Sequence, residues 1–219
     1  MANKKKEIYI VDDHPLMRKG MAMTLQSELE FDVAGQSETA EEALQNILDL
    51  KPDLAVIDIS LPGMNGIELI KNLLSQLPDL KILVVSRHDE ELYAERAIRA
   101  GAKGYLMKLE AGDTLVKAAR QILNGGIFLS EEIGSQIIMK MTTGKGNSSS
   151  DPLELLSDRE LEVFELTGKG ETTKDIAQKL HVSVKTVESY RARIKEKMDL
   201  KSANELLRRA VQWVEKSSM

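Results

Sequence analysis

The chain of 219 residues contains no cysteine. This absence excludes a disulfide-bonded scaffold, a thiolate metal site and a cysteine nucleophile, and it suits the reducing cytosol. No apolar run is long enough to cross a membrane, and the first run, Ile8 to Val11, is also too short for a secretory signal. We therefore expect a cytoplasmic protein that is neither secreted nor embedded in a membrane.

Aromatic residues are scarce, at 4%, but hydrophobic residues make up 42% of the chain, which is enough for a packed core. The net charge of -5 does not suit a protein that binds nucleic acid along its whole length. The charge is unevenly distributed, however. Residues 153–219 carry 13 Lys/Arg and 12 Asp/Glu, whereas residues 1–152 carry 17 and 23. We expect two domains with different tasks.

Short apolar runs alternate with amphipathic segments over the first 126 residues. The apolar runs predict five strands, at residues 7–11, 31–35, 54–58, 81–86 and 104–107. The segments after them have apolar residues at helical spacing, and Asn124-Gly125-Gly126 ends the last of the five predicted helices. This alternation is typical of an α/β fold with a parallel, doubly wound sheet, so we assign residues 1–126 to such a domain.

Two stretches with no strand pattern follow this domain. Residues 127–152 predict a connecting helix and then a flexible linker rich in Gly, Ser and Thr. Residues 153–219 contain only helix signals, including two S-x-x-E capping boxes, Ser157 to Glu160 and Ser202 to Glu205. Thr172 or Thr173, and Ser183, can cap two further helices. We therefore expect an all-α bundle of four short helices.

Polar side chains follow four of the five predicted strands. They are Asp12 and Asp13, Asp58, Ser86 and Lys108. Because the carboxyl ends of parallel strands meet at one edge of a sheet, we expect these side chains to lie together. Three carboxylates need a counter-charge, which Mg²⁺ and the ammonium group of Lys108 would supply. Such a site favours a phosphoryl group on a carboxylate, and Asp58 on the central strand is the expected nucleophile.

These residues lie in motifs that resemble the receiver domain of two-component response regulators. The motifs are VDDH at residues 11–14, D-x-S-x-P-G-x-x-G at residues 58–66, Val85-Ser86, and GAKGYLMK at residues 101–108. The resemblance implies a flavodoxin-like fold in which Asp58 accepts a phosphoryl group from a sensor histidine kinase. It also implies that Mg²⁺ is bound by Asp13, Asp58 and the backbone carbonyl of Ser60, with Asp12 helping through water.

The resemblance further implies a switch pair, Ser86 and Tyr105, whose hydroxyl and ring respond to the phosphate. Many receiver domains have Lys-Pro with a cis peptide where this chain has Lys108-Leu109. A cis bond before a residue other than proline costs about 3 kcal/mol, so we expect a trans bond or a reshaped loop here. We expect His14 to be a loop residue beside the acid pair, rather than a phosphate relay or a metal ligand.

Residues 172–198 show the pattern of a helix, a short turn and a second, basic helix, which suits the DNA major groove. A basic helix face alone is weak evidence, because most such faces are only solvated. Val184, Val187 and Ile194, with Tyr190 or Met198 as a further member, are the expected inner face of the second helix. Residues 156–166, Gly170, and residues 175–180 and 182–198 resemble the LuxR-type helix-turn-helix, and the whole chain resembles the NarL/FixJ class of response regulators.

This second resemblance implies a DNA-facing set of side chains. The set is Lys185, Thr186, Glu188, Ser189, Arg191 and Arg193. We expect Lys185, Thr186 and Arg193 mainly at phosphates, and Glu188 and Ser189 at base edges. The family often has Lys in place of Glu188 and His in place of Tyr190, so the target sequence does not follow from the resemblance. A homodimer on two half-sites is expected, with the last helix as the family's usual dimer element.

We therefore interpret the chain as a transcription factor that is controlled by phosphorylation of Asp58. It would be an enzyme only in gaining and losing its own phosphoryl group. One alternative is a phosphotransferase or phosphatase for small substrates, but such an enzyme would need an acid where Ser60 stands. The other is an adaptor that signals through protein contacts, or a receiver that works without phosphate.

Overall fold

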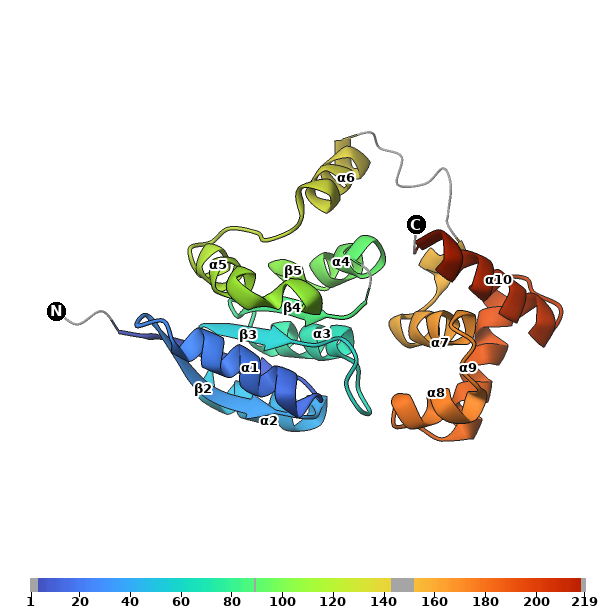
Figure 1. Ribbon diagram of the computed structural model, residues 1–219, viewed down its shortest axis with the longest axis horizontal. Helices are drawn as coiled ribbons and strands as arrows, with labels where there is room; N and C mark the ends of the chain where they lie inside the picture. The colour runs from blue at the N-terminus through green and yellow to red at the C-terminus, as the bar shows by residue number, and fades with distance from the viewer. Residues whose placement is uncertain (1–3, 89, 143–151, 218–219) are drawn as a thin grey trace. The chain divides into compact units, whose positions relative to one another are not determined.

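The structure is a computed structural model that describes residues 4–88, 90–142 and 152–217 (Figure 1). The chain divides into two compact units, Met1–Thr142 and Thr143–Met219. The predicted connecting helix is α6 (Glu131–Thr142), which closes the first unit. Most of the predicted linker, residues 143–151, lies outside the described residues. None of the described helices combines the length and the apolar character that a membrane crossing needs.

The first unit contains the predicted five-stranded parallel sheet. The strands are β1 (Lys6–Val11), β2 (Phe31–Ser37), β3 (Leu54–Ile57), β4 (Lys81–Ser86) and β5 (Gly104–Met107). Their order in the sheet is β2-β1-β3-β4-β5, and every neighbouring pair is parallel. The central strand β3 is apolar and buried throughout, as expected of a strand covered on both faces.

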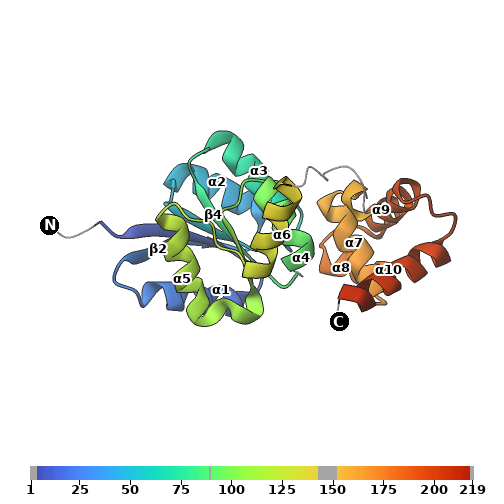
Figure 2. The ribbon, with the colours of Figure 1, turned by 90° about the horizontal axis from the view of Figure 1, so that it is seen from above.

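Helices cover both faces of this sheet. They are α1 (Pro15–Gln26), α2 (Ala40–Leu50), α3 (Gly66–Gln76), α4 (Glu90–Arg99) and α5 (Ala111–Leu123). Figure 2 shows α1 and α5 on one side of the strands and α2 and α3 on the other, in agreement with the contacts between these helices. Ile8, Ile10 and Val56 project from alternate strand positions into the core beneath α1 and α5. Side chains cap two of the helices: Thr39 accepts a hydrogen bond at the start of α2, and Asn65 at the start of α3.

The second unit is the predicted bundle of four helices. They are α7 (Asp158–Gly168), α8 (Thr173–Lys179), α9 (Val184–Lys197) and α10 (Ala203–Ser217). The predicted capping box at Ser157 and Glu160 is formed in full. The one at Ser202 is only half formed: its hydroxyl accepts from the backbone N–H of Glu205, but the Glu205 carboxylate accepts from the N–H of Lys201 instead.

Val187 and Ile194 form the inner face of α9, and both are fully buried. The prediction that Val184 belongs to this face is wrong, because Val184 is 43% exposed. It is the first residue of α9, one turn before the first fully buried residue of that helix, Val187. The ring of Phe164 in α7 lies 5.7 Å from the ring of Trp213 in α10, and this aromatic contact packs α7 against α10.

Gly66, the first residue of α3, lies against the backbone of Asp58. A methyl group added at Gly66 would come within 2.0 Å of the carbonyl oxygen of Asp58, and a backbone atom cannot yield cheaply. Gly66→Ala should therefore destabilise the first unit by about 1–3 kcal/mol. Differential scanning calorimetry should show a lower melting temperature for this unit only, with Trp213 fluorescence, a reporter in the second unit, unchanged.

Gly20→Ala is the matched control, because a methyl group at Gly20 in α1 meets nothing within 4 Å. It should stabilise the helix by up to about 1 kcal/mol. Equal melting temperatures for the two variants would contradict the close approach of Gly66 to Asp58.

Candidate functional site

The predicted polar side chains meet at the carboxyl edge of the sheet. Asp12 and Asp13 follow β1, Asp58 follows β3, Ser86 ends β4, and Lys108 follows β5. In the pairing of β1 with β3, Val11 lies opposite Ile57, so Asp12 lies beside Asp58. The parallel sheet thus brings four separate loops to one place.

Lys108 bridges two buried carboxylates. Its Nζ lies 2.7 Å from Asp12 Oδ2 and 2.7 Å from Asp58 Oδ2. The side chain of Lys108 is only 6% exposed, and those of Asp12 and Asp58 are 0% and 2% exposed. A buried carboxylate is costly unless it is paired, so the two acids depend on the single ammonium group that they share.

The burial of Asp58 changes the pKa of its carboxyl group. Burial raises the pKa of the Asp58 carboxyl above its ordinary value, the Lys108 ammonium opposes that rise, and the Asp12 carboxylate adds to it. The balance is a raised pKa, because burial outweighs the help of Lys108. Asp58 therefore needs more positive charge than Lys108 alone supplies when it is ionised.

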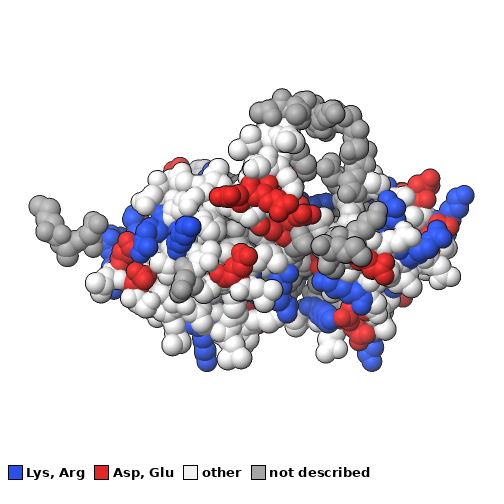
Figure 3. All heavy atoms as spheres, turned by 45° about the horizontal axis from the view of Figure 1, so that its top comes forward, with Lys and Arg blue, Asp and Glu red and all other residues white. Residues whose placement is uncertain are grey.

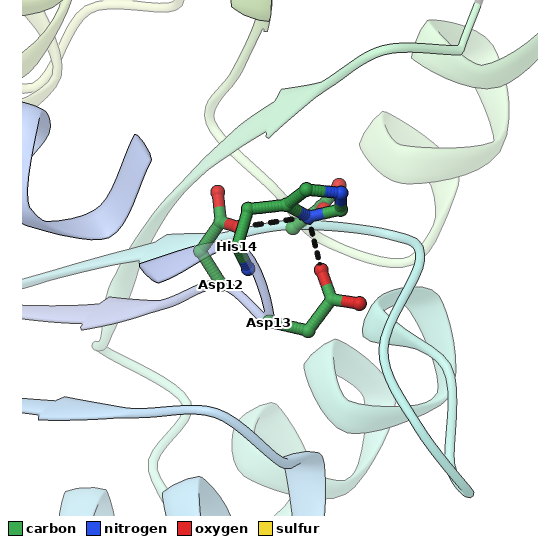
Figure 4. Close-up of side chains that lie close together, drawn as sticks. Asp12, Asp13 and His14 are labelled. Atoms are coloured by element: carbon green, nitrogen blue, oxygen red, sulfur yellow. Dashed lines mark hydrogen bonds and ion pairs between the residues drawn. The ribbon is translucent and has the colours of Figure 1, made fainter. Parts of the chain in front are cut away.

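The donor atoms at this edge fit a divalent cation. Asp12, Asp13, His14 and Asp58 each offer one ligand atom, and these atoms all lie within 4.8 Å of one another. Figure 4 shows the side chains of the first three turned toward one another. Asp12 Oδ2, Asp13 Oδ1 and His14 Nδ1 are buried atoms without a hydrogen bond among the described residues, although Asp12 Oδ2 pairs with Lys108 and Asp13 Oδ1 contacts His14 Nδ1. Carboxylate oxygens are the ligands that Mg²⁺ prefers in proteins.

Arg18, which sequence reasoning did not single out, holds the loop that carries Asp12. Its guanidinium donates one hydrogen bond to the backbone carbonyl of Asp12 and another, of 2.6 Å, to Glu38 Oε1. The side chain of Arg18 is only 12% exposed, whereas that of its partner Glu38 is 61% exposed. Its place in the first turns of α1 distinguishes it from other basic residues only when the fold is known.

His88 connects the expected switch pair with the loop after Asp58. Its backbone N–H donates to Ser86 Oγ at 3.3 Å, and its carbonyl accepts from the hydroxyl of Tyr105 at 2.8 Å. Its ring Nε2 lies 2.7 Å from Ser60 Oγ, and the backbone N–H of Ser60 points at Asp58 Oδ1 at 3.4 Å. Tyr105 is buried. Sequence reasoning missed His88, since the β4–α4 loop has no pattern that marks it.

The Lys108–Leu109 peptide is trans, as expected, because the described residues contain no cis bond. A short 3₁₀ helix, η1 (Lys108–Glu110), forms the loop, and the side chain of Leu109 is 94% exposed. The departure from Lys-Pro therefore leaves the ammonium group of Lys108 at the site.

The predicted DNA-facing residues share the outer part of α9. Lys185, Glu188, Ser189 and Arg193 are exposed. Thr186 and Arg191 are half-buried, and Arg191 Nη1 donates a 2.8 Å hydrogen bond to Thr173 Oγ1 at the start of α8. Arg191 thus links α9 to the start of α8. On the face seen in Figure 3, the second unit shows Lys and Arg side chains interspersed with Asp and Glu.

Two family models match the chain, one for each unit. The model described as response regulator receiver domain matches residues 8–120, and the model described as bacterial regulatory proteins, luxR family, matches residues 154–210. Among curated proteins, the oxygen regulatory protein NreC of Staphylococcus carnosus is 35% identical over 209 residues, which cover 94% of this chain and 96% of that protein. NreC of Staphylococcus epidermidis is 36% identical over 210 residues, with the same coverage.

Solved structures give the same picture. A LuxR-family two-component response regulator from an Aurantimonas species has a TM-score of 0.59 at 30% identity, covering 64% of this chain and 99% of that one. RcsB from Salmonella enterica serovar Typhimurium, bound to promoter rprA in the presence of the phosphomimetic BeF3-, has a TM-score of 0.61 at 26% identity, covering 94% and 98%.

The raised pKa of Asp58 predicts a pH-dependent effect on stability. Because the pKa is higher in the folded than in the unfolded state, stability falls as the pH rises from about 4 through the folded pKa. Asp58→Asn removes this cost. Without metal at pH 7, it should raise the stability of the first unit by on the order of 1 kcal/mol, measured by urea unfolding.

The gain from Asp58→Asn should disappear below about pH 4, where wild-type Asp58 is protonated in both states. Asp32→Asn is the control, because Asp32 is an exposed carboxylate on β2. A loss of stability on Asp58→Asn at pH 7 would contradict the electrostatic account.

Proposed function

Because the chain belongs to the two-component response regulators with a receiver domain and a LuxR-type DNA-binding domain, we propose a phosphorylation-controlled function for it. Phosphorylation of Asp58 by a sensor histidine kinase controls the binding of the chain to promoter DNA. The observation that carries the proposal is the bridge from Lys108 to Asp12 and Asp58. It places a cation beside a buried carboxylate whose pKa is raised by burial. Such an arrangement can stabilise the extra negative charge of a phosphoryl group.

The chemistry is a transfer to a carboxylate oxygen of Asp58. That oxygen attacks phosphorus, the bond from phosphorus to the donor's imidazole nitrogen breaks, and an acyl phosphate forms on Asp58. Lys108 would hold a phosphoryl oxygen, and Ser86 would donate its hydroxyl hydrogen to another. A Mg²⁺ ion held by Asp13, Asp58 and the carbonyl of Ser60, with Asp12 acting through water, would neutralise the phosphoryl charge.

The switch would work through His88. Ser86 accepts a hydrogen bond from the backbone of His88, and Tyr105 donates one to its carbonyl. When the Ser86 hydroxyl turns to a phosphoryl oxygen, the contacts of this loop change, and the population of Tyr105 conformations shifts with them. Phosphorylation would reach the DNA-binding domain through that shift.

The second unit would bind double-stranded DNA with α9 in the major groove. The exposed basic residues Lys185 and Arg193 would contact phosphates, and Glu188 could accept a hydrogen bond from cytosine N4. RcsB, a structural relative, has been solved as two dimers bound to two parallel DNAs, which supports a homodimer here. On α10, Leu206 is buried in the bundle while Leu207 is 42% exposed, so Leu207 is available for a dimer contact.

A regulator of this kind acts in the cytoplasm, where the promoter DNA lies. It has no substrate other than the donor of its own phosphoryl group, which it gains and later loses at Asp58. Neither an external small substrate nor a permanent protein scaffold is needed to explain the two domains.

Phosphorylation can be tested with acetyl phosphate and Mg²⁺, followed by intact mass. The wild-type chain should gain one phosphoryl group and Asp58→Asn none. Lys108→Met should slow the gain about 100-fold, because one buried donor to the phosphoryl group is lost. Lys103→Met, which removes an exposed ammonium from the loop before β5, should react at the wild-type rate. A phosphorylated Asp58→Asn protein would refute the assignment of the acceptor.

DNA binding can be tested by selecting sequences from a random library with the phosphorylated chain. Lys185→Ala should weaken all sequences about equally and reduce the slope of log affinity against log salt by about 1. Glu188→Gln should instead change the selected base at one position, with little change in slope. Lys201→Ala, between α9 and α10, serves as an exposed control.

Failure to enrich any sequence, with phosphorylation intact, would favour the adaptor. Equal enrichment by wild type and Asp58→Asn would show that DNA binding does not depend on phosphate.

A further inference from the structure

His14 lies between two acids that belong to the proposed metal site. Its ring Nδ1 contacts Asp13 Oδ1 and lies 3.4 Å from Asp12 Oδ1 (Figure 4). Together with a carboxylate oxygen of Asp58, these donor atoms lie within 4.8 Å of one another, close enough to surround one ion. The imidazole is the only donor in this set that is not a carboxylate oxygen.

Apart from its contacts with these two acids, the ring takes no part in capping the helix that follows. His14 is the residue that precedes α1, where a side chain usually accepts a hydrogen bond from the first turn of the helix. The side chain of His14 makes no such bond. Its Nδ1 is shielded from solvent and has no hydrogen bond among the described residues, although 40% of the side chain is exposed.

The backbone holds this position without help from the ring. The N–H of His14 donates a 2.8 Å hydrogen bond to Asp12 Oδ1, and its carbonyl accepts from the N–H of Arg18 at 3.0 Å. Pro15 fixes the first turn of the helix that follows. The ring nitrogen is therefore presented to the acids by a loop that is already ordered.

We propose that His14 is a ligand, through Nδ1, to the divalent cation that binds Asp13 and Asp58, and that it biases the site toward first-row transition ions such as Mn²⁺. The inference rests on the proposed metal site and corrects the expectation that His14 is only a loop residue. Mg²⁺ prefers oxygen ligands and retains water, whereas the affinity of a site with a nitrogen ligand rises along the first-row series that begins with Mn²⁺. An imidazole among carboxylates therefore raises affinity for Mn²⁺ more than for Mg²⁺.

The experiment uses the full unphosphorylated chain and Mn²⁺ as the probe. Electron paramagnetic resonance measures free Mn²⁺ in a titration, Mg²⁺ affinity follows from competition, and electron spin echo envelope modulation detects a nitrogen bound to Mn²⁺. His14→Gln should lose the nitrogen modulation and bind Mn²⁺ about tenfold more weakly. Its Mg²⁺ affinity should change by less than about threefold, because Gln can offer an oxygen or leave water in place.

His181→Asn is the control, since His181 is an exposed histidine of the second unit that is absent from the donor set, and Asn tolerates its positive φ. It should keep the nitrogen modulation and the Mn²⁺ affinity. Wild-type Mn²⁺ without nitrogen modulation would overturn the proposal and leave His14 as a hydrogen-bond donor to Asp13. Modulation that disappears in His181→Asn rather than His14→Gln would also overturn it.

Asp13→Asn separates this inference from the proposed function. If Asp13→Asn abolishes binding of both ions while His14→Gln changes neither, the metal site stands and the role of His14 is refuted. If Asp13→Asn and Asp58→Asn both bind Mn²⁺ and Mg²⁺ as the wild type does, the metal site itself is wrong.

Discussion

Two carboxylates share one ammonium group at the carboxyl edge of the sheet, and the arrangement of the site depends on it. Lys108 Nζ lies 2.7 Å from both Asp12 and Asp58, with all three side chains almost fully shielded from water. One positive charge does not balance two negative charges, and the raised pKa of Asp58 reflects that deficit. The site is therefore compatible with a further cation.

Several elements of the fold position the residues of this site. Strand β3 is buried on both faces, so the first polar side chain after it, Asp58, is carried to the sheet edge and no further. Gly66 allows α3 to begin against the backbone of Asp58. Arg18, in α1, donates a hydrogen bond to the backbone carbonyl of Asp12. His88 then joins the same edge to Ser86 and Tyr105. Through Ser60 and His88, hydrogen bonds and close contacts run from the Asp58 carboxylate to Ser86 and Tyr105.

Much of this could be predicted from the sequence, for physical reasons. Apolar runs that end in Asp58 or Lys108 mark buried parallel strands, and parallel strands must bring their ends together. Contacts between loops could not be predicted in this way. The His88 contact with Ser60 and the Arg18 contact with Asp12 depend on how loops fold back, and neither follows from periodicity. Val184 was misplaced because helical spacing does not show where a bundle ends.

The most direct test of the central claim is an experimental structure of the protein with Mg²⁺ and beryllium trifluoride, a phosphoryl mimic. The account predicts the mimic on the Asp58 carboxylate, Lys108 Nζ within hydrogen-bond distance of a fluorine atom, and the ion on the side of Asp12 and Asp13. A mimic bound to another carboxylate, or a Lys108 side chain turned away from the pocket, would contradict it.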